Sequence, residues 1–237
     1  MKTSSRNMLN LAVTVVLAVL AALCASLAWA ESQQRIVRDP FQRSVPAIVL
    51  NGQTIFQAIA RLYVSTGIVV SVERMLDDKG TGEMDRKFTA TIPAASTTVV
   101  LNEICALDGR YAWSRDGNVV NIYPSKTLGD PNYLFNRRIP VFHLNAVSQA
   151  SSAAIQADEE LPGPRSQLIL LGAGGTDFAK PWTVTLKNLT LRMAMNRIAQ
   201  HLCATCGWQL LKSRSSEPTV MFYYKLQPED FSAEQKR

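Results

Sequence analysis

The chain has 237 residues, of which 25 are basic and 19 acidic, and 47% are hydrophobic. This length is sufficient for two modest domains with separate cores. The basic residues are scattered along the chain, whereas a nucleic-acid surface needs a clustered basic stripe with stacking aromatics. The composition therefore argues against a nucleic-acid partner.

An apolar run without charges occupies residues 11–30. It ends with the small residues Ala28 and Ala30, which suit the −3 and −1 positions of an export cleavage site. Cleavage there predicts a mature chain that begins at Glu31. A run of 20 residues can also span a bilayer, so an uncleaved membrane anchor stays an alternative.

Export would change the charge of the chain only slightly. Lys2 and Arg6 precede the run, so its removal leaves 23 basic and 19 acidic residues, a net charge of +4.

Lipid attachment at Cys24 is disfavoured because Leu23 is bulky where that processing needs a small residue. We expect a periplasmic or secreted protein, bound to a membrane only if residues 11–30 are retained.

After an N-terminal extension, 31–44, residues 45–124 predict the order strand, helix, strand, strand, helix, strand, strand. The predicted elements are strands 47–50, 68–72 and 87–92, a helix from Thr54 to Gly67, a helix from Ser96 or Thr97 to Gly109, and a hairpin over 110–123. Thr54 is a typical N-cap, Gly67 a typical C-terminal glycine, and Asp116-Gly117 a typical hairpin turn.

The same order is predicted again after a linker, 125–138, and before a polar tail, 228–237. The expected elements of residues 139–227 are strands 139–144, 167–171 and 182–187, a helix over 147–161, a helix over 190–202 and a hairpin over 208–226. Here, too, apolar spacing near 3.6 or 2 distinguishes helices from strands.

The two halves share a phrase that aligns without a gap at a distance of 94 residues. "FTATIPAASTTVVLNEI", 88–104, matches "WTVTLKNLTLRMAMNRI", 182–198. The alignment places Thr89 on Thr183 and Asn102 on Asn196. We therefore predict an α+β protein of two tandem small β-α-β-β-α-β-β domains, each with two helices packed on short mixed sheets.

Residues 45–124 resemble the secretin and TonB short N-terminal (STN) domain family. The features that carry the resemblance are "LNGQTIFQAIARLYVSTGIVVSV", "FTATIPAASTTVVLNEICALDGRYAW" and "DGNVVNIYP". Residues 139–227 are similar to a more distant copy. The resemblance implies a periplasmic docking domain without catalysis, which meets secretion-system or signalling components of the envelope.

Cys203 and Cys206 form a CxxC motif. Redox pairs of this kind sit at a helix N-terminus, where the dipole stabilises a thiolate, but this pair follows a predicted helix. A structural disulfide, free thiols and, with less support, a thiol-disulfide enzyme all stay open. Cys105 is expected to be a small core residue.

Other catalytic, cofactor or metal sites are not predicted. "GAGG", 172–175, lacks the third glycine and the following helix of a dinucleotide fingerprint. His143 and His201 have no acidic residue at ligand spacing.

The closing hairpins are the candidates for partner binding. We expect Tyr123 and Tyr223 on outward faces, because exposed aromatics are enriched at interfaces. Asn121 is expected beside Tyr123 on an open sheet edge to which a protein segment could add. Binding of cell-wall glycan or a small ligand by these aromatics is the remaining alternative.

Overall fold

The computed structural model describes residues 39–75, 85–162, 169–171, 177–212 and 219–223. The predicted export segment, the GAGG motif and the polar tail lie outside the described residues. The chain divides into two compact units, 1–42 and 43–237. In the first, Pro40–Gln42 form a 3-10 helix, η1, and the Gln42 N–H donates to the Asp39 carbonyl.

The second unit is an α+β structure in which one order of elements occurs twice. The first half comprises β1 (Ser44–Val45), β2 (Ile48–Thr54), α2 (Ile55–Thr66), β3 (Val69–Met75), β4 (Lys87–Ile92), β5 (Ala95–Ser96), α3 (Thr97–Leu107), β6 (Tyr111–Asp116) and β7 (Val119–Pro124). The second comprises β8 (Arg138–Gln149), α4 (Ala150–Glu159), β9 (Ile169–Leu171), β10 (Asp177–Thr190), α5 (Leu191–Leu202), β11 (Gly207–Lys212) and β12 (Thr219–Tyr223). The predicted fold class is confirmed.

Local sequence signals define the helix ends. Thr54 caps α2 through a reciprocal box with Gln57, and Gly67 ends it with a φ of 69°. Ser96 and Thr190 cap α3 and α5 without such a box, by accepting the backbone N–H of Val99 and of Met193, and they are 94 residues apart. The repeated phrase therefore begins both helices with the same hydrogen bond from a backbone N–H to a side-chain hydroxyl.

Two threonines of the 94-residue repeat make matching hydrogen bonds to a backbone position of positive φ in each half. The Thr89 hydroxyl accepts a hydrogen bond from the Gly52 N–H at 3.3 Å, and the Thr183 hydroxyl accepts one from the Ala146 N–H at 2.9 Å. Gly52 and Ala146 both have a positive φ, of 64° and 52°. A side chain of the repeat thus stabilises the same left-handed backbone position in each half.

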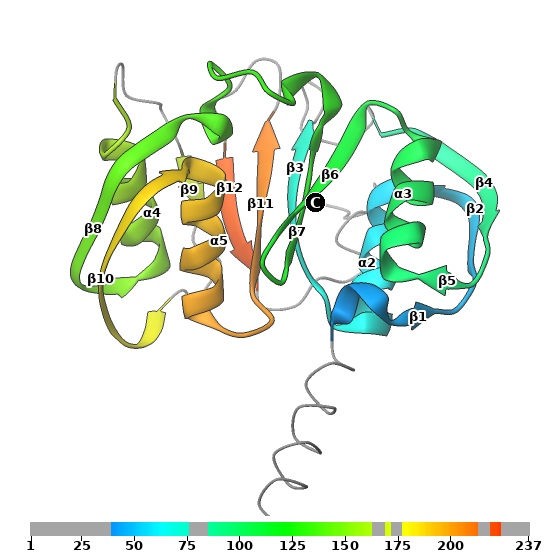
Figure 1. The fold of residues 1–237 in the computed structure, drawn as a ribbon, viewed down its shortest axis with the longest axis horizontal. Coiled ribbons are helices and arrows are strands. Elements are labelled where there is room, and N and C mark those ends of the chain that lie inside the picture. The colour runs from blue at the N-terminus through cyan, green and yellow to red at the C-terminus, as the bar shows by residue number, and fades with distance from the viewer. Residues whose placement is uncertain (1–38, 76–84, 163–168, 172–176, 213–218, 224–237) are drawn as a thin grey trace, which may run out of the picture. The chain divides into compact units, whose positions relative to one another are not determined.

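The halves join in one six-stranded sheet with the order β6-β7-β3-β11-β12-β9 (Figure 1). Each half contributes a hairpin followed by a third strand, β3 in the first half and β9 in the second. Within each half the two hairpin strands are antiparallel. The second of them pairs in parallel with the third strand, β7 with β3 and β12 with β9. β3 and β11 pair in parallel between Val72 and Met75 on one side and Gln209 and Lys212 on the other, which connects the halves.

The helices of the two halves cover opposite faces of this sheet. Successive residues of a strand point to opposite faces. On β3, the Arg74 guanidinium lies over the Phe56 ring of α2, whereas Glu73 contacts Arg192 of α5. α5 therefore extends beyond its own half and covers strands of the first half as well.

Residues outside the six-stranded sheet form three antiparallel pairs of strands: β1 with β5, β2 with β4, and β8 with β10. The β8–β10 pair, which we call the ribbon, contains the longest strands described, and α4 and α5 pack on it. Figure 1 shows the ribbon curving around these two helices.

The segment predicted as a linker contributes to the core. Residues 125–138 include two short 3-10 helices, η2 (Ser125–Thr127) and η3 (Leu134–Asn136). Phe135 is fully buried and stacks on Trp208 with ring centroids 5.1 Å apart. The connection between the halves is thus packed in the core of the second half.

Candidate functional site

The prediction that Tyr123 lies on an outward face is wrong. Tyr123 is only 4% exposed, and Asn121 is buried. The reason is that α5 of the second half covers this face of β7, with the Arg192 guanidinium 4.5 Å from the centre of the Tyr123 ring. Tyr123 is thus positioned to hold the halves together, and neither Tyr123 nor Asn121 lies on an exposed face.

Tyr223 also belongs to the junction between the halves. It is half-buried, and its hydroxyl donates to the Val70 carbonyl of β3. Gly207 lies beside both, where a Cβ atom would clash with the Val70 carbonyl oxygen and the Tyr223 hydroxyl. Both edges of the β11–β12 hairpin are thus paired within the chain, with β3 and with β9, whereas β6 of the first hairpin pairs only with β7 among the described strands.

A buried ion pair connects β3 to α5. The Glu73 carboxylate accepts hydrogen bonds from Arg192 at 2.5 and 3.2 Å and from the Tyr133 hydroxyl at 2.7 Å. Arg192 also donates to the Asn136 side chain at 2.8 Å. Burial raises the pKa of Glu73, against the charge and hydrogen bonds of Arg192, and burial beside Glu73 raises the pKa of Tyr133.

A second buried polar cluster lies farther along α5, around Asn196. Its side-chain oxygen accepts from the Trp208 indole at 2.7 Å and the Ser71 hydroxyl at 3.1 Å. Its amide donates to Asp116 at 2.9 Å, and Asp116 pairs with Arg197 at 3.2 Å. Buried polar groups satisfied in this way specify one arrangement of the halves.

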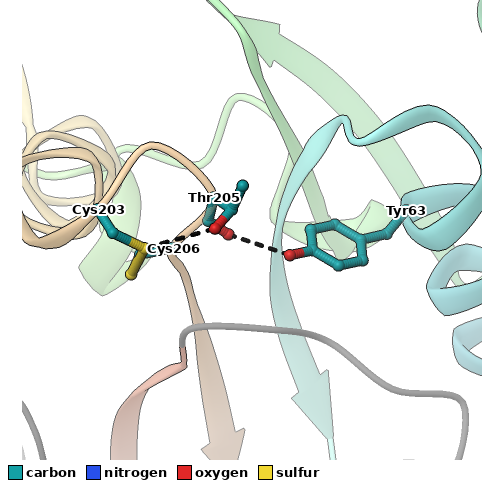
Figure 2. Close-up of a disulfide and its surroundings, with 4 residues drawn as sticks. All are labelled: Tyr63, Cys203, Thr205 and Cys206. Atoms are coloured by element: carbon teal, nitrogen blue, oxygen red, sulfur yellow. Dashed lines mark hydrogen bonds between the residues drawn. A yellow bond between two sulfur atoms is a disulfide. The ribbon is translucent and has the colours of Figure 1, made fainter.

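Cys203 and Cys206 form a disulfide, which settles the pairing that the sequence left open. Figure 2 shows it on the turn between α5 and β11, where the Thr205 carbonyl accepts a hydrogen bond from the Tyr63 hydroxyl at 3.3 Å. Tyr63 belongs to α2 of the first half. The closed turn therefore also contributes to the contact between the halves.

The surroundings of the bridge suit a structural role. Cys203 is the C-cap of α5, where the helix dipole opposes a thiolate, and the Cys206 sulfur belongs to a fully buried residue. Cys105, as expected, is buried. Burial and the nearby Asp108 carboxylate raise the pKa of the Cys105 thiol to about 12.

The two histidines lie apart. His143 is exposed on the ribbon, with its Nδ1 2.7 Å from the Thr185 hydroxyl. His201 stacks on Trp182 with ring centroids 4.4 Å apart, and burial lowers its pKa. Among the described ranges, no group of three or more His, Cys, Asp or Glu residues is arranged to hold a metal ion.

The ribbon leaves the largest stretch of strand backbone open. In the part of the chain that the structure describes, β8 and β10 pair with no other strand. Phe142 and Leu144 are buried on its inner face, whereas Val141 is 44% exposed opposite Lys187. Its sequence pattern is an ordinary alternation, so nothing in the sequence distinguished it from a covered strand.

A cleft lies at the end of the six-stranded sheet. Its volume is about 510 Å³, and it is lined by Met75, Arg86, Gly109, Arg110, Tyr111, Pro124, Ser125 and Lys126. A smaller cavity of about 230 Å³ adjoins it and shares Met75, Pro124 and Lys126. Sequence reasoning missed this cleft because its basic residues come from three separate connections and form no motif.

No helix in the described ranges is both long enough and apolar enough to cross a membrane. The chain matches no protein-family model, and comparisons with curated proteins and with solved structures found no significant match.

Proposed function

We propose that this protein is an exported, non-enzymatic docking module of the bacterial cell envelope, which binds a protein partner at the β8–β10 ribbon. The resemblance of residues 45–124 to STN domains supports the class of function, and the apolar run before Glu31 supports export. The observation that carries the proposal is the open backbone of the ribbon.

The ribbon is suited to strand addition. A strand that pairs on one side presents unpaired N–H and C=O groups on the other, and an extended segment can complete them. β8 has 12 residues and β10 has 14, so either edge could take a long segment. The exposed face, with Val141 and His143 on β8, would then select among partner side chains.

The matching pair in the first half, β2–β4, is less suited. β2 has seven residues and β4 has six. The Val49 carbonyl of β2 already accepts a hydrogen bond from Arg61 of α2 at 2.7 Å. The longer ribbon of the second half is thus the better docking edge.

A charge at Val141 tests this proposal. A photo-crosslinking residue on the exposed ribbon should capture a defined envelope protein, and Val141→Lys should reduce the affinity of that purified partner by roughly tenfold. Val99→Lys is the matched control, because Val99 of α3 is also 44% exposed. Equal affinity of both variants for the partner would reject the ribbon as the docking surface.

Export has its own test. The mass of the protein recovered from the envelope should correspond to a chain that begins at Glu31. A mass that includes residues 1–30 would indicate an anchored protein instead, and would leave the docking surface unaffected.

A further inference from the structure

We propose that the cleft of about 510 Å³ at the end of the six-stranded sheet binds a small organic anion, a carboxylate or a phosphate ester with an apolar body. This inference is independent of the docking function, because the cleft and the ribbon share no residues.

The cleft lies where sheets commonly bind ligands. β3 ends at Met75 and β7 ends at Pro124, and the two strands are parallel, so their carboxyl ends meet at one edge of the sheet. In open α/β sheets, clefts outside the carboxyl ends of parallel strands are the usual ligand sites, and the pairing of β3 with β7 reproduces this arrangement locally. Tyr111, the first residue of β6, reaches the same edge.

The charge of the cleft favours an anion. Its lining contains Arg86, Arg110 and Lys126 and no acidic side chain. The nearest carboxylates have partners of their own: Asp108 is held by Arg110 at 2.6 and 2.8 Å, and Asp85 by Arg74 at 2.6 Å. Basic side chains that converge in a partly enclosed cleft concentrate positive potential there.

Two of these cations are available to a ligand. Arg86 and Lys126 are exposed and form no ion pair among the described residues. Arg110 is already engaged by Asp108, with its backbone N–H as well as its guanidinium. We therefore assign the direct contacts with the anion to Arg86 and Lys126.

Tyr111 supplies a second, independent indication of a ligand. The residue is only 6% exposed, and its hydroxyl oxygen accepts a hydrogen bond from the Met75 N–H at 3.4 Å. Burial raises the pKa of Tyr111 to about 12, so the hydroxyl keeps its proton. No described residue accepts that proton, and an oxyanion in the cleft would do so.

Shape and lining define the rest of the ligand. A volume of about 510 Å³ is typical of a small-molecule site. Met75 and Pro124 give the cleft an apolar wall that suits a short hydrocarbon or aromatic body. The adjoining cavity is lined by Glu73 and Asp130, so the anionic group belongs in the larger cleft, near Arg86 and Lys126.

Calorimetric titration with three probes of similar size tests the site. Phenylacetate and phenyl phosphate distinguish the carboxylate from the phosphate, and 2-phenylethanol is the neutral control. At constant ionic strength, we expect saturable binding of at least one anion and weaker binding of the alcohol. Absence of saturable binding for both anions, or equal binding of the alcohol, would overturn the proposal.

Variants of the purified full-length protein locate the binding. Arg86→Gln and Lys126→Gln should each reduce the affinity for the bound anion by roughly tenfold. Lys87→Gln is the matched control, because Lys87 is an exposed neighbour of Arg86 outside the cleft lining. Tyr111→Phe should also weaken binding.

If Tyr111→Phe fails to fold, the other two variants still test the site, because Arg86 and Lys126 are exposed and their substitution should not impair folding. Unchanged affinity in both Gln variants would refute the site. Partner capture by the ribbon should be the same in all these variants, so failure of one proposal does not imply failure of the other.

Discussion

Asn102 and Asn196, 94 residues apart, each accept a hydrogen bond from the indole N–H of a tryptophan on the strand that follows their helix. The distances are 2.8 Å from Trp113 and 2.7 Å from Trp208. The same residue of the repeat thus anchors the same strand in each half. Their surroundings differ, since Asn102 is exposed and Asn196 is buried where the halves meet.

Asn196→Ala should therefore cost far more stability than Asn102→Ala. The first leaves the Trp208 indole N–H and the Ser71 hydroxyl buried without their acceptor, which should cost about 3 kcal/mol. The second exposes its partner to water and should cost less than about 1 kcal/mol. Urea unfolding of both variants checks the ranking, and equal costs would contradict the buried role of Asn196.

Removing one member of the buried ion pair should also destabilise the protein. Arg192→Met keeps the packing over Tyr123 but leaves Glu73 buried without its cation, at a cost of about 3–5 kcal/mol. The double variant Glu73→Gln with Arg192→Met should recover a large part of that loss. If the two changes were simply additive in urea unfolding, the pair would not be coupled.

The disulfide should make only a small contribution to stability. It closes a short loop, with a sequence separation of three between Cys203 and Cys206, and a short loop removes little chain entropy. Replacing both residues with Ala should lower the free energy of unfolding by about 1–2 kcal/mol and leave partner binding intact. Loss of function in a stably folded variant would instead point to thiol-disulfide chemistry, which insulin reduction can measure.

Gly207 should not tolerate a side chain. A Cβ atom there would collide with the Val70 carbonyl and the Tyr223 hydroxyl, so Gly207→Ala should cost about 2 kcal/mol by forcing β11 from β3. Gly109→Ala is the control, because nothing lies within 4 Å of its Cβ position, and it should change stability by less than about 0.5 kcal/mol. Equal melting temperatures of the two variants would argue against the close approach of the strands.

Cys105 should resist alkylation in the folded protein. With a thiol pKa of about 12, it forms roughly a thousandfold less thiolate at pH 8 than an ordinary cysteine. Iodoacetamide should therefore label the native chain from Glu31 onward very slowly. In urea without reductant, mass spectrometry should find one labelled thiol. Rapid native labelling would contradict the burial of this residue, and three labelled thiols would contradict the disulfide.

Much of the fold follows from local sequence signals. The caps at Thr54 and Ser96 and the glycine at position 67 form as predicted, because each depends on backbone interactions within a few residues. The predicted hairpin also forms, with its turn at Gly117-Asn118, one residue after the predicted Asp116-Gly117. The 94-residue echo likewise predicted matched elements in the two halves. These signals determined the order of elements and the α+β class.

The relation between the halves was decided only by tertiary structure. The pairing of β3 with β11 joins strands more than 130 positions apart, and the alternation of residues in each strand is the same whether its edge is open or paired. The alternation of residues also shows that Tyr123 and Ile122 point to opposite faces of β7, but both faces of this strand are buried.

The prediction of an outward face at Tyr123 failed for this reason. Tyr123 and Asn121 occupy a face of β7 that an isolated first half would leave open, and α5 of the other half covers it. In contrast, Arg86 and Lys126 line a cleft that no local motif indicates. The sequence by itself determined which segments form helices and strands, since those choices are local. Which faces and edges remain accessible was decided by long-range packing, because burial depends on elements that are distant in the chain.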